Sequence, residues 1–154
     1  MKLTSVAFAN EDRIPSKYTC DGEDLNPPLQ ISEVPKDAKS LVLIVDDPDA
    51  PGRTWVHWTM WDIDPSLTEF PESFNPSGDA REGITSFGKP GYGGPCPPSG
   101  VHHYFFKLYA LNVQLNLPAE ARAEDIEAAM QGQILARAEL LGLYGREGQE
   151  TSQK

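Results

Sequence analysis

The sequence has only two cysteines, and its 13 lysine and arginine residues are outnumbered by 23 aspartate and glutamate residues. Two cysteines are too few for a disulfide framework or a four-thiolate zinc site. The net charge of −10 at pH 7 argues against non-specific binding to nucleic acid or to an anionic membrane. No apolar run approaches the ~18 residues of a transmembrane helix, and residues 1–9 are too short and too interrupted for a signal peptide. We therefore expect a cytoplasmic protein with no nucleic-acid partner and no stable membrane insertion.

The two cysteines, Cys20 and Cys96, lie far apart in the sequence. A bond between them would close a long loop and contribute ~4 kcal/mol in the chain-entropy model. A reducing cytosol disfavours such a bond. The sequence leaves their pairing open.

The length of 154 residues favours one domain with a sizeable core, over residues 1–146, followed by a polar tail over residues 147–154. The 14 prolines and 13 glycines interrupt the first three quarters of the chain, where long helices are excluded. The intervening segments predict strands over residues 4–8, 29–32, 40–46, 56–62, 84–87 and 104–112. Residues 41–45 are apolar without interruption, which predicts a strand buried on both faces.

The sequence changes character after Pro118. No proline follows, and apolar residues recur at helical spacing at Ile126, Met130, Ile134 and Leu141. This spacing predicts a helical region that begins at Pro118 or Ala119 and ends at Gly142 or Gly145, with Gly132 as a candidate break within it. The expected architecture is a mainly β domain with a C-terminal helical element.

Chemically active side chains occur where the predicted strands begin or end. Asp47 and its neighbouring prolines follow the most buried strand. This segment could carry functional carboxylates, or it could be a turn whose carboxylates are simply solvated. His57 begins the next strand beside tryptophans. His102 and Tyr104 project to one face of a later strand and His103 to the other.

The glycine- and proline-rich segment 91–100 precedes these last residues and could direct backbone N–H groups towards an anion. Residues 83–119 contain no aspartate or glutamate, whereas residues 46–82 contain nine. A loop and a buried strand also have little room for charge, so this bias supports an anion site without requiring one.

Two segments together resemble the signature regions of the phosphatidylethanolamine-binding protein (PEBP) family, which is also called Raf kinase inhibitor-like. They are Asp47-Pro48-Asp49-Ala50-Pro51 with Trp55-x-His57-Trp58, and Gly94-Pro95-Cys96-Pro97-Pro98-x-Gly100-x-His102-His103-Tyr104. The segments 18–29 and 134–146 resemble its bacterial and archaeal branch. The resemblance covers nearly the whole chain, in order.

This resemblance implies a β-sandwich of two sheets with a small pocket for phosphate-like anions, such as phosphorylated small molecules, head groups or side chains. The ligand-binding residues carried over by motif are Asp47, Pro51, Trp55, His57, Gly94, His102 and Tyr104. Cys96 stands where animal members carry a proline, and His103 where they carry an arginine, which leaves the identity of the ligand open. The resemblance implies no cofactor.

The residues suggest a role for each polar group. Imidazole and phenol groups can donate to phosphate oxygens, and the backbone of Gly93 and Gly94 could add a donor. We expect Asp47 to orient and charge His57 or His102, or to share a proton with the ligand. We also expect phosphate affinity to rise as the pH falls through the histidine range.

A non-catalytic binding or regulatory protein is the main hypothesis. The alternatives are a hydrolase-type enzyme that uses the Asp/His/Tyr pocket or Cys96, a metal site built from Asp47 and the histidines, and a protein-interaction or inhibitor module built on residues 95–98. The family resemblance also suggests a protein partner, through which the protein would regulate a kinase or a protease. An edge strand or the C-terminal helix could support a homodimer, and the sequence does not decide the oligomeric state.

Overall fold

The computed structural model describes residues 1–146, which form two β-sheets, one α-helix and one 3₁₀ helix. The small sheet has the strand order β1-β3-β6, and the large sheet has the order β2-β9-β8-β4-β5-β7. The bounds of the small-sheet strands are β1 Lys2–Thr4, β3 Leu29–Ser32 and β6 Glu69–Phe70. Those of the large sheet are β2 Asp12–Arg13, β4 Ser40–Asp47, β5 Trp55–Ile63, β7 Arg81–Glu82, β8 Val101–Leu111 and β9 Ile134–Gly145.

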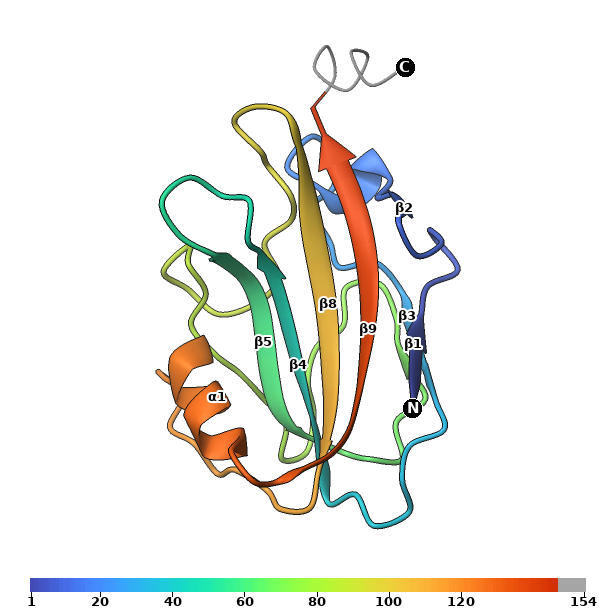
Figure 1. The fold of residues 1–154 in the computed structure, drawn as a ribbon, viewed down its shortest axis with the longest axis vertical. Coiled ribbons are helices and arrows are strands. Elements are labelled where there is room, and N and C mark those ends of the chain that lie inside the picture. The colour runs from blue at the N-terminus through green and yellow to red at the C-terminus, as the bar shows by residue number, and fades with distance from the viewer. Residues whose placement is uncertain (147–154) are drawn as a thin grey trace.

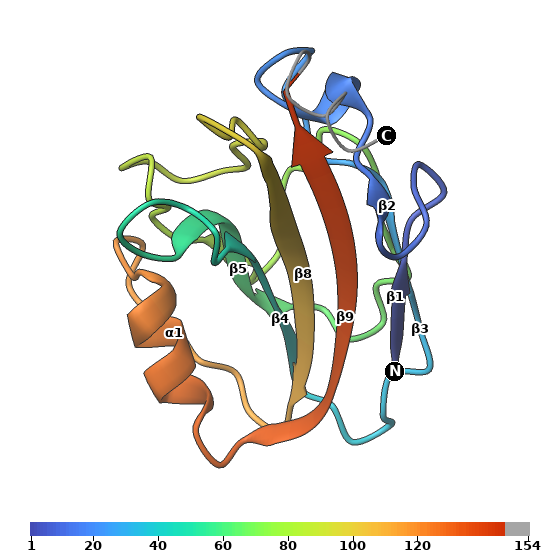
Figure 2. The same cartoon turned by 45° about the horizontal axis from the view of Figure 1, so that its top comes forward.

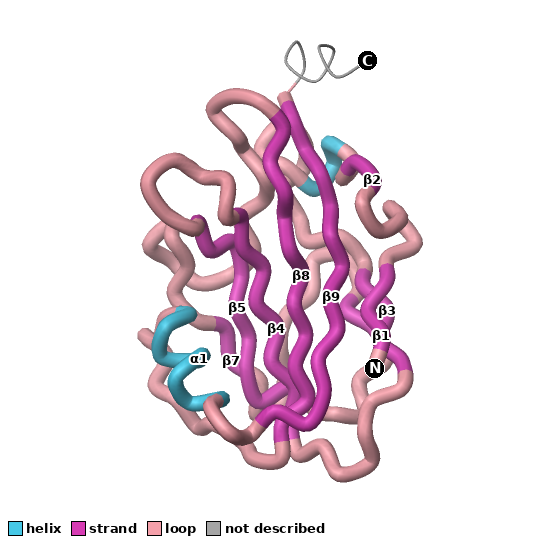
Figure 3. Tube along the Cα trace, viewed as in Figure 1, coloured by secondary structure: helices cyan, strands magenta, loops and turns pink. Residues whose placement is uncertain are grey.

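The long central strands of the large sheet pair antiparallel, and the short edge strand β2 pairs parallel to β9 (Figure 1). The 3₁₀ helix η1 spans Ser16–Tyr18 and the helix α1 spans Ala123–Met130. Figure 3 shows how little of the chain is helical. The predicted mainly β architecture of two sheets is confirmed.

β4 is buried along its whole length because apolar groups cover both faces of the large sheet. Leu41, Leu43 and Val45 pack into the core between the two sheets. Val42 and Ile44 pack on the opposite face, under the helix α1. Figure 2 shows α1 on one side of the large sheet and the strands β1 and β3 on the other. The predicted two-sided burial of this strand is confirmed.

The predicted long C-terminal helical region is wrong in its second half. The helix ends at Met130, Gly132 turns the chain with a φ of 75°, and residues 134–145 form the strand β9. Helix-forming residues dominate this segment, but pairing along the whole length of β8 overrides their local preference. Ile126 and Met130 therefore belong to the helix, whereas Ile134 and Leu141 belong to a strand.

Two of the predicted strands also differ from the structure. The first strand covers Lys2–Thr4 rather than residues 4–8. Residues 84–87 form no strand, because Thr85 closes a turn in which its N–H and its hydroxyl both donate to the Lys89 carbonyl. The predicted tail over residues 147–154 lies outside the described residues. Within residues 1–146, no helix has the length and apolar character needed to cross a membrane.

Candidate anion site

β4 ends, and β5 and β8 begin, at the same end of the large sheet (Figure 1). Residues from this end line a cavity of about 300 Å³. One part of its lining is polar and is made by side chains from these three strands. The rest is apolar and comes from the loops that connect them. The lining residues are Asp47, Ala50, Pro51, Trp55, His57, Phe87, Cys96, Pro97, Pro98, His102 and Tyr104. Six of the seven residues that the resemblance assigned to ligand binding, all except Gly94, line this one cavity.

The turn after β4 is held against β8 by two carboxylate–imidazole pairs. Asp47 Oδ1 accepts the backbone N–H of Asp49 at 2.8 Å, which is an Asx-turn. Asp47 Oδ2 lies 2.6 Å from Nδ1 of His102, with both side chains buried. Asp49 accepts hydrogen bonds from the backbone N–H and the imidazole of His103, which is half exposed on the other face. Asp47 therefore closes the turn after β4 and also bonds an imidazole of the cavity, so the structural and the functional interpretation of this residue are compatible.

His57 lies at a β-bulge in β5. Val45 pairs with Trp58 and Asp46 pairs with Val56, so that His57 is the extra residue of β5. A bulge changes the direction of a side chain and is frequent beside functional sites. The residue types of β5 do not specify this bulge, so the sequence could not reveal it.

Both imidazoles of the cavity use Nδ1 to bond the protein. Nδ1 of His57 lies 2.7 Å from the Gly93 carbonyl, which accepts only, so this nitrogen carries the proton. Nδ1 of His102 likewise donates to the Asp47 carboxylate. Nε2 of each ring makes no hydrogen bond within residues 1–146. Burial lowers the pKa of His57 below its usual 6.5, although the Gly93 carbonyl and nearby carboxylates act to raise it. His57 is therefore uncharged at neutral pH.

Tyr104 lies between the two imidazoles and carries an unpaired hydroxyl. Its ring centroid lies 5.3 Å from that of His57 and 6.3 Å from that of His102. The hydroxyl is buried and has no hydrogen-bond partner within the described part of the chain. Burial, and then the negative charges of Asp47 and Asp49, raise the pKa of this phenol, so it keeps its proton. A buried donor without a partner is costly, and a ligand oxygen in the cavity would satisfy it.

The Tyr104→Phe variant tests whether this hydroxyl serves a ligand, because ligand affinity should fall while the free energy of unfolding does not. Removal of an unpaired buried hydroxyl should leave the free energy of unfolding unchanged or raise it by about 1 kcal/mol. Phosphate affinity should fall by about tenfold, since a hydrogen bond to an anion is lost. Urea denaturation and calorimetric titration measure the two quantities, with Tyr109→Phe on the same strand as the control. A less stable variant that binds phosphate normally would contradict the reading.

Phe87 forms an aromatic wall that the sequence analysis did not identify as part of the site. Its ring meets Trp55 edge-on at 5.5 Å and His57 at 5.4 Å, and 41% of the residue is exposed. Ala50, Pro97 and Pro98 complete the apolar part. Phe87 lies in a turn, where no periodic pattern of apolar residues could have indicated its role in the cavity.

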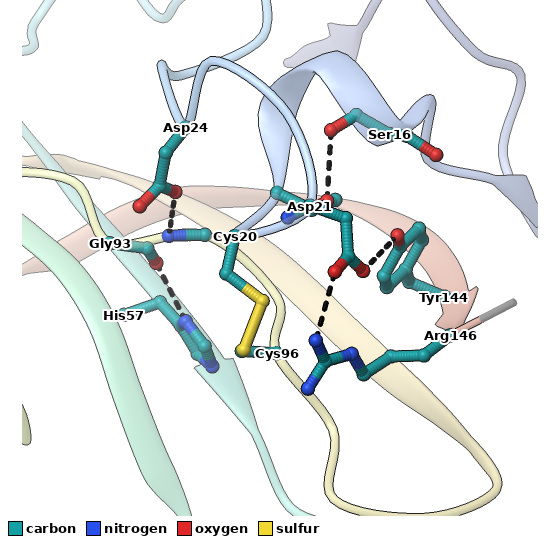
Figure 4. Close-up of a disulfide and its surroundings, with 11 residues drawn as sticks. Ser16, Cys20, Asp21, Asp24, His57, Gly93, Cys96, Tyr144 and Arg146 are labelled. Carbon is teal, nitrogen blue, oxygen red and sulfur yellow. Dashed lines mark hydrogen bonds and ion pairs between the residues drawn. A yellow bond between two sulfur atoms is a disulfide. The ribbon is translucent and has the colours of Figure 1, made fainter.

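Gly94 supports the cavity from behind instead of lining it. Its backbone N–H donates to Asp24 Oδ1 at 2.8 Å, and that of Gly93 donates to the His57 carbonyl. These two N–H groups are therefore engaged within the protein, and the expected backbone donor at this point is not free. Figure 4 shows Gly93 bonded to His57 and the Asp24 carboxylate beside the same stretch of backbone.

Cys20 and Cys96 are joined in a disulfide, with their Cα atoms 5.5 Å apart (Figure 4). This settles the pairing that the sequence left open. Cys96 consequently has no free thiol, and the alternative of a cysteine nucleophile lacks its reactive group in this structure. Among residues 1–146, no group of three His, Cys, Asp or Glu side chains is arranged to hold a metal ion.

The sequence matches one protein family over nearly its whole length. The family model of the phosphatidylethanolamine-binding protein matches residues 4–145. The chain belongs to the PEBP family. This confirms the resemblance drawn from the two motif regions.

Relatives in the PEBP family match over nearly the full chain. A UPF0098 protein of Methanothermobacter thermautotrophicus is 49% identical over 150 residues, which cover 95% of this chain and 99% of that protein. The crystal structure of a PEBP homologue from Chlamydia trachomatis superposes with a TM-score of 0.89 at 41% identity, over 95% of this chain and 97% of the other. Escherichia coli YbcL, described as a member of the mammalian PEBP family, gives 0.88 at 30% identity, over 95% and 98%.

Proposed function

We propose that this PEBP-family protein binds small phosphate-like anions in the cavity and acts as a binding or regulatory protein rather than as a catalyst. The observation that carries the proposal is the buried hydroxyl of Tyr104 between two imidazoles, since within residues 1–146 neither this hydroxyl nor the Nε2 atom of either imidazole has a hydrogen-bond partner. Tyr104 can donate to an oxygen of one tetrahedral anion, and Nε2 of each imidazole can donate as well once both of its ring nitrogens carry a proton.

The charges around the cavity support a proton-linked mode of binding. Asp47 is buried and would repel an anion, but its hydrogen bond to Nδ1 places the His102 imidazole between that carboxylate and a ligand. Nε2 of His102 donates to the ligand only in the imidazolium form. His57 holds its single proton on Nδ1, so at neutral pH its Nε2 can only accept. An anion favours the imidazolium form, in which Nε2 also donates. Binding should therefore be accompanied by uptake of a proton at His57.

The expected pH dependence follows from the sign of this shift. The pKa of His57 lies below 6.5 in the free protein, and a bound anion raises it. Affinity should therefore increase as the pH falls from about 8 to about 5.5, by at most about tenfold per pH unit for one proton. Sulfate is the preferred probe, because it stays a dianion across this range whereas phosphate itself titrates.

Calorimetric titration with sulfate, phosphate and phosphoethanolamine at several pH values tests the proposal. The His57→Gln variant keeps a polar side chain without the titration, and its affinity should depend less on pH. Heats measured in buffers of different ionisation enthalpy count the protons taken up. Saturable binding with a flat pH profile would contradict the His57 mechanism, and no binding at millimolar anion would contradict the function.

A further inference from the structure

The cavity changes from polar to apolar between its closed end and its opening. Its polar lining residues are all buried, and they are Asp47, His57, His102 and Tyr104. Of the other lining residues, solvent reaches all but one: Pro51, Phe87, Cys96 and Pro98 are exposed, Ala50 and Trp55 are partly exposed, and Pro97 is buried. The polar groups therefore lie at the closed end. Most of the apolar groups surround the opening, which we call the mouth of the cavity.

A phosphate group at the closed end would fill only part of the cavity. At about 30 Å³ for each non-hydrogen atom, its five atoms would occupy roughly half of the volume of about 300 Å³. Three of its oxygens can face Tyr104, His57 and His102. The fourth substituent of the tetrahedral phosphorus then points towards the mouth, so a phosphate ester would place its organic group there.

Phe87 provides a fixed apolar surface at the mouth. It is 41% exposed, and it is one of the residues that line the cavity. Its ring meets Trp55 and His57 edge-on. The ring also lies against Gly93, where an added Cβ atom would be 2.4 Å from Cε2 of Phe87. These three contacts hold the ring in place, and its exposed surface is available to a ligand.

The charges near the mouth favour an uncharged organic group. Among the residues within 1–146 that line the mouth, none carries a carboxylate that would attract a cation. Asp47 lies at the closed end, where it bonds His102. The Arg53 guanidinium lies 5.7 Å from the centre of the Trp55 ring and would repel an ammonium group at the mouth.

We propose that the cavity takes phosphate monoesters of a phenol or of another compact apolar alcohol, and that Phe87 selects for their uncharged organic group. The proposal rests on the proposed function and names the class of ligand for the same site. Contact with Phe87 removes apolar surface of the ligand from water, and a pair of aromatic rings adds a further attraction.

Calorimetric titrations with phenyl phosphate, methyl phosphate and phosphoethanolamine test the proposal. All three are phosphate monoesters, and at about pH 7 the phosphate of each is mainly doubly charged, because its second pKa is near 6. They differ in the organic group. Phenyl phosphate should bind about tenfold more tightly than methyl phosphate. Phosphoethanolamine should bind no more tightly than methyl phosphate.

Two variants of the mouth test the role of Phe87. The Phe87→Ala variant should reduce the preference for phenyl phosphate over methyl phosphate from about tenfold to less than about threefold. The readout is the ratio of the two affinities, because Phe87 also touches His57 and both affinities can shift together. Gly93→Ala should lower the same ratio, since its Cβ atom would displace the Phe87 ring while its backbone can still bond His57.

Leu135→Ala is the matched control. Leu135 is also 41% exposed, but it lies on β9 and is not among the residues that line the cavity. This variant should keep the full preference for phenyl phosphate. Amide NMR spectra of each variant report whether the fold is intact.

Equal affinity of the unmodified protein for phenyl phosphate and methyl phosphate would overturn the inference and leave the proposed function standing. Tighter binding of phosphoethanolamine than of phenyl phosphate would also overturn it, because the mouth would then recognise an ammonium group. An undiminished preference in Phe87→Ala and Gly93→Ala would overturn the role of Phe87. Absence of binding by all three esters would instead overturn the proposed function, and this inference with it.

Discussion

The His102→Ala variant is expected to lose phosphate binding, with an affinity reduced by at least roughly 100-fold. A donor to the anion disappears, and the buried Asp47 carboxylate is left facing the ligand without its imidazole partner. The same unpaired carboxylate should lower the free energy of unfolding at neutral pH by about 3 kcal/mol. Calorimetry measures the first effect and urea denaturation the second.

His103→Ala is the matched control for this experiment. His103 neighbours His102 on β8 and also pairs with an aspartate, but 49% of its side chain is exposed. Surface pairs of this kind contribute less than about 1 kcal/mol, and the imidazole points away from the cavity. This variant should bind phosphate normally. Equal losses in both variants would show that the imidazoles act through the fold of β8 and not through the cavity.

The Gly94→Ala variant is expected to be destabilised by about 2 to 3 kcal/mol and to bind phosphate several times more weakly. A Cβ atom at this position would lie 2.4 Å from the Tyr18 carbonyl oxygen and 2.9 Å from Cα of Thr19. Both are backbone atoms, so the loop of residues 91–100 would have to move away from residues 16–24. Thermal or urea unfolding, followed by titration with phosphate, measures the two effects.

This variant also separates two roles for Gly94. Alanine keeps the backbone N–H, so a residue that only donated to the ligand would tolerate the change with little loss of stability. Asp24→Asn is the control, because its amide oxygen can still accept the N–H of Gly94. Wild-type stability in Gly94→Ala would contradict the packing role that the structure gives this glycine.

The strands that could be predicted from the sequence are those whose burial is visible in the pattern of residue types. β4 is uniformly apolar because both of its faces are covered, and β8 alternates because only one of its faces is fully buried. β9 could not be predicted, since alanine, leucine, glutamate and arginine favour a helix and only its pairing with β8 makes it a strand.

The polar part of the site could be predicted and its supporting contacts could not. Asp47, His57, His102 and Tyr104 have side chains whose chemistry is recognisable, and they occur within the two motif regions. Their relative positions are set by the pairing of β4 with β5, which includes a bulge at His57, and by the register between β4 and β8, and residue types specify neither. The contact between Asp24 and Gly94 joins residues far apart in the chain, and no local pattern indicates it.

The two-sided burial of β4 has a consequence for the cooperativity of the fold. Its alternate side chains belong to the hydrophobic cluster between the sheets and to the cluster under α1, so neither cluster can open without exposing the other. We therefore expect the two clusters to unfold as a single cooperative unit. The cavity lies at the end of this unit and is completed by loops outside it, so those loops can rearrange around a ligand while the strands that carry Asp47, His57 and His102 remain in place.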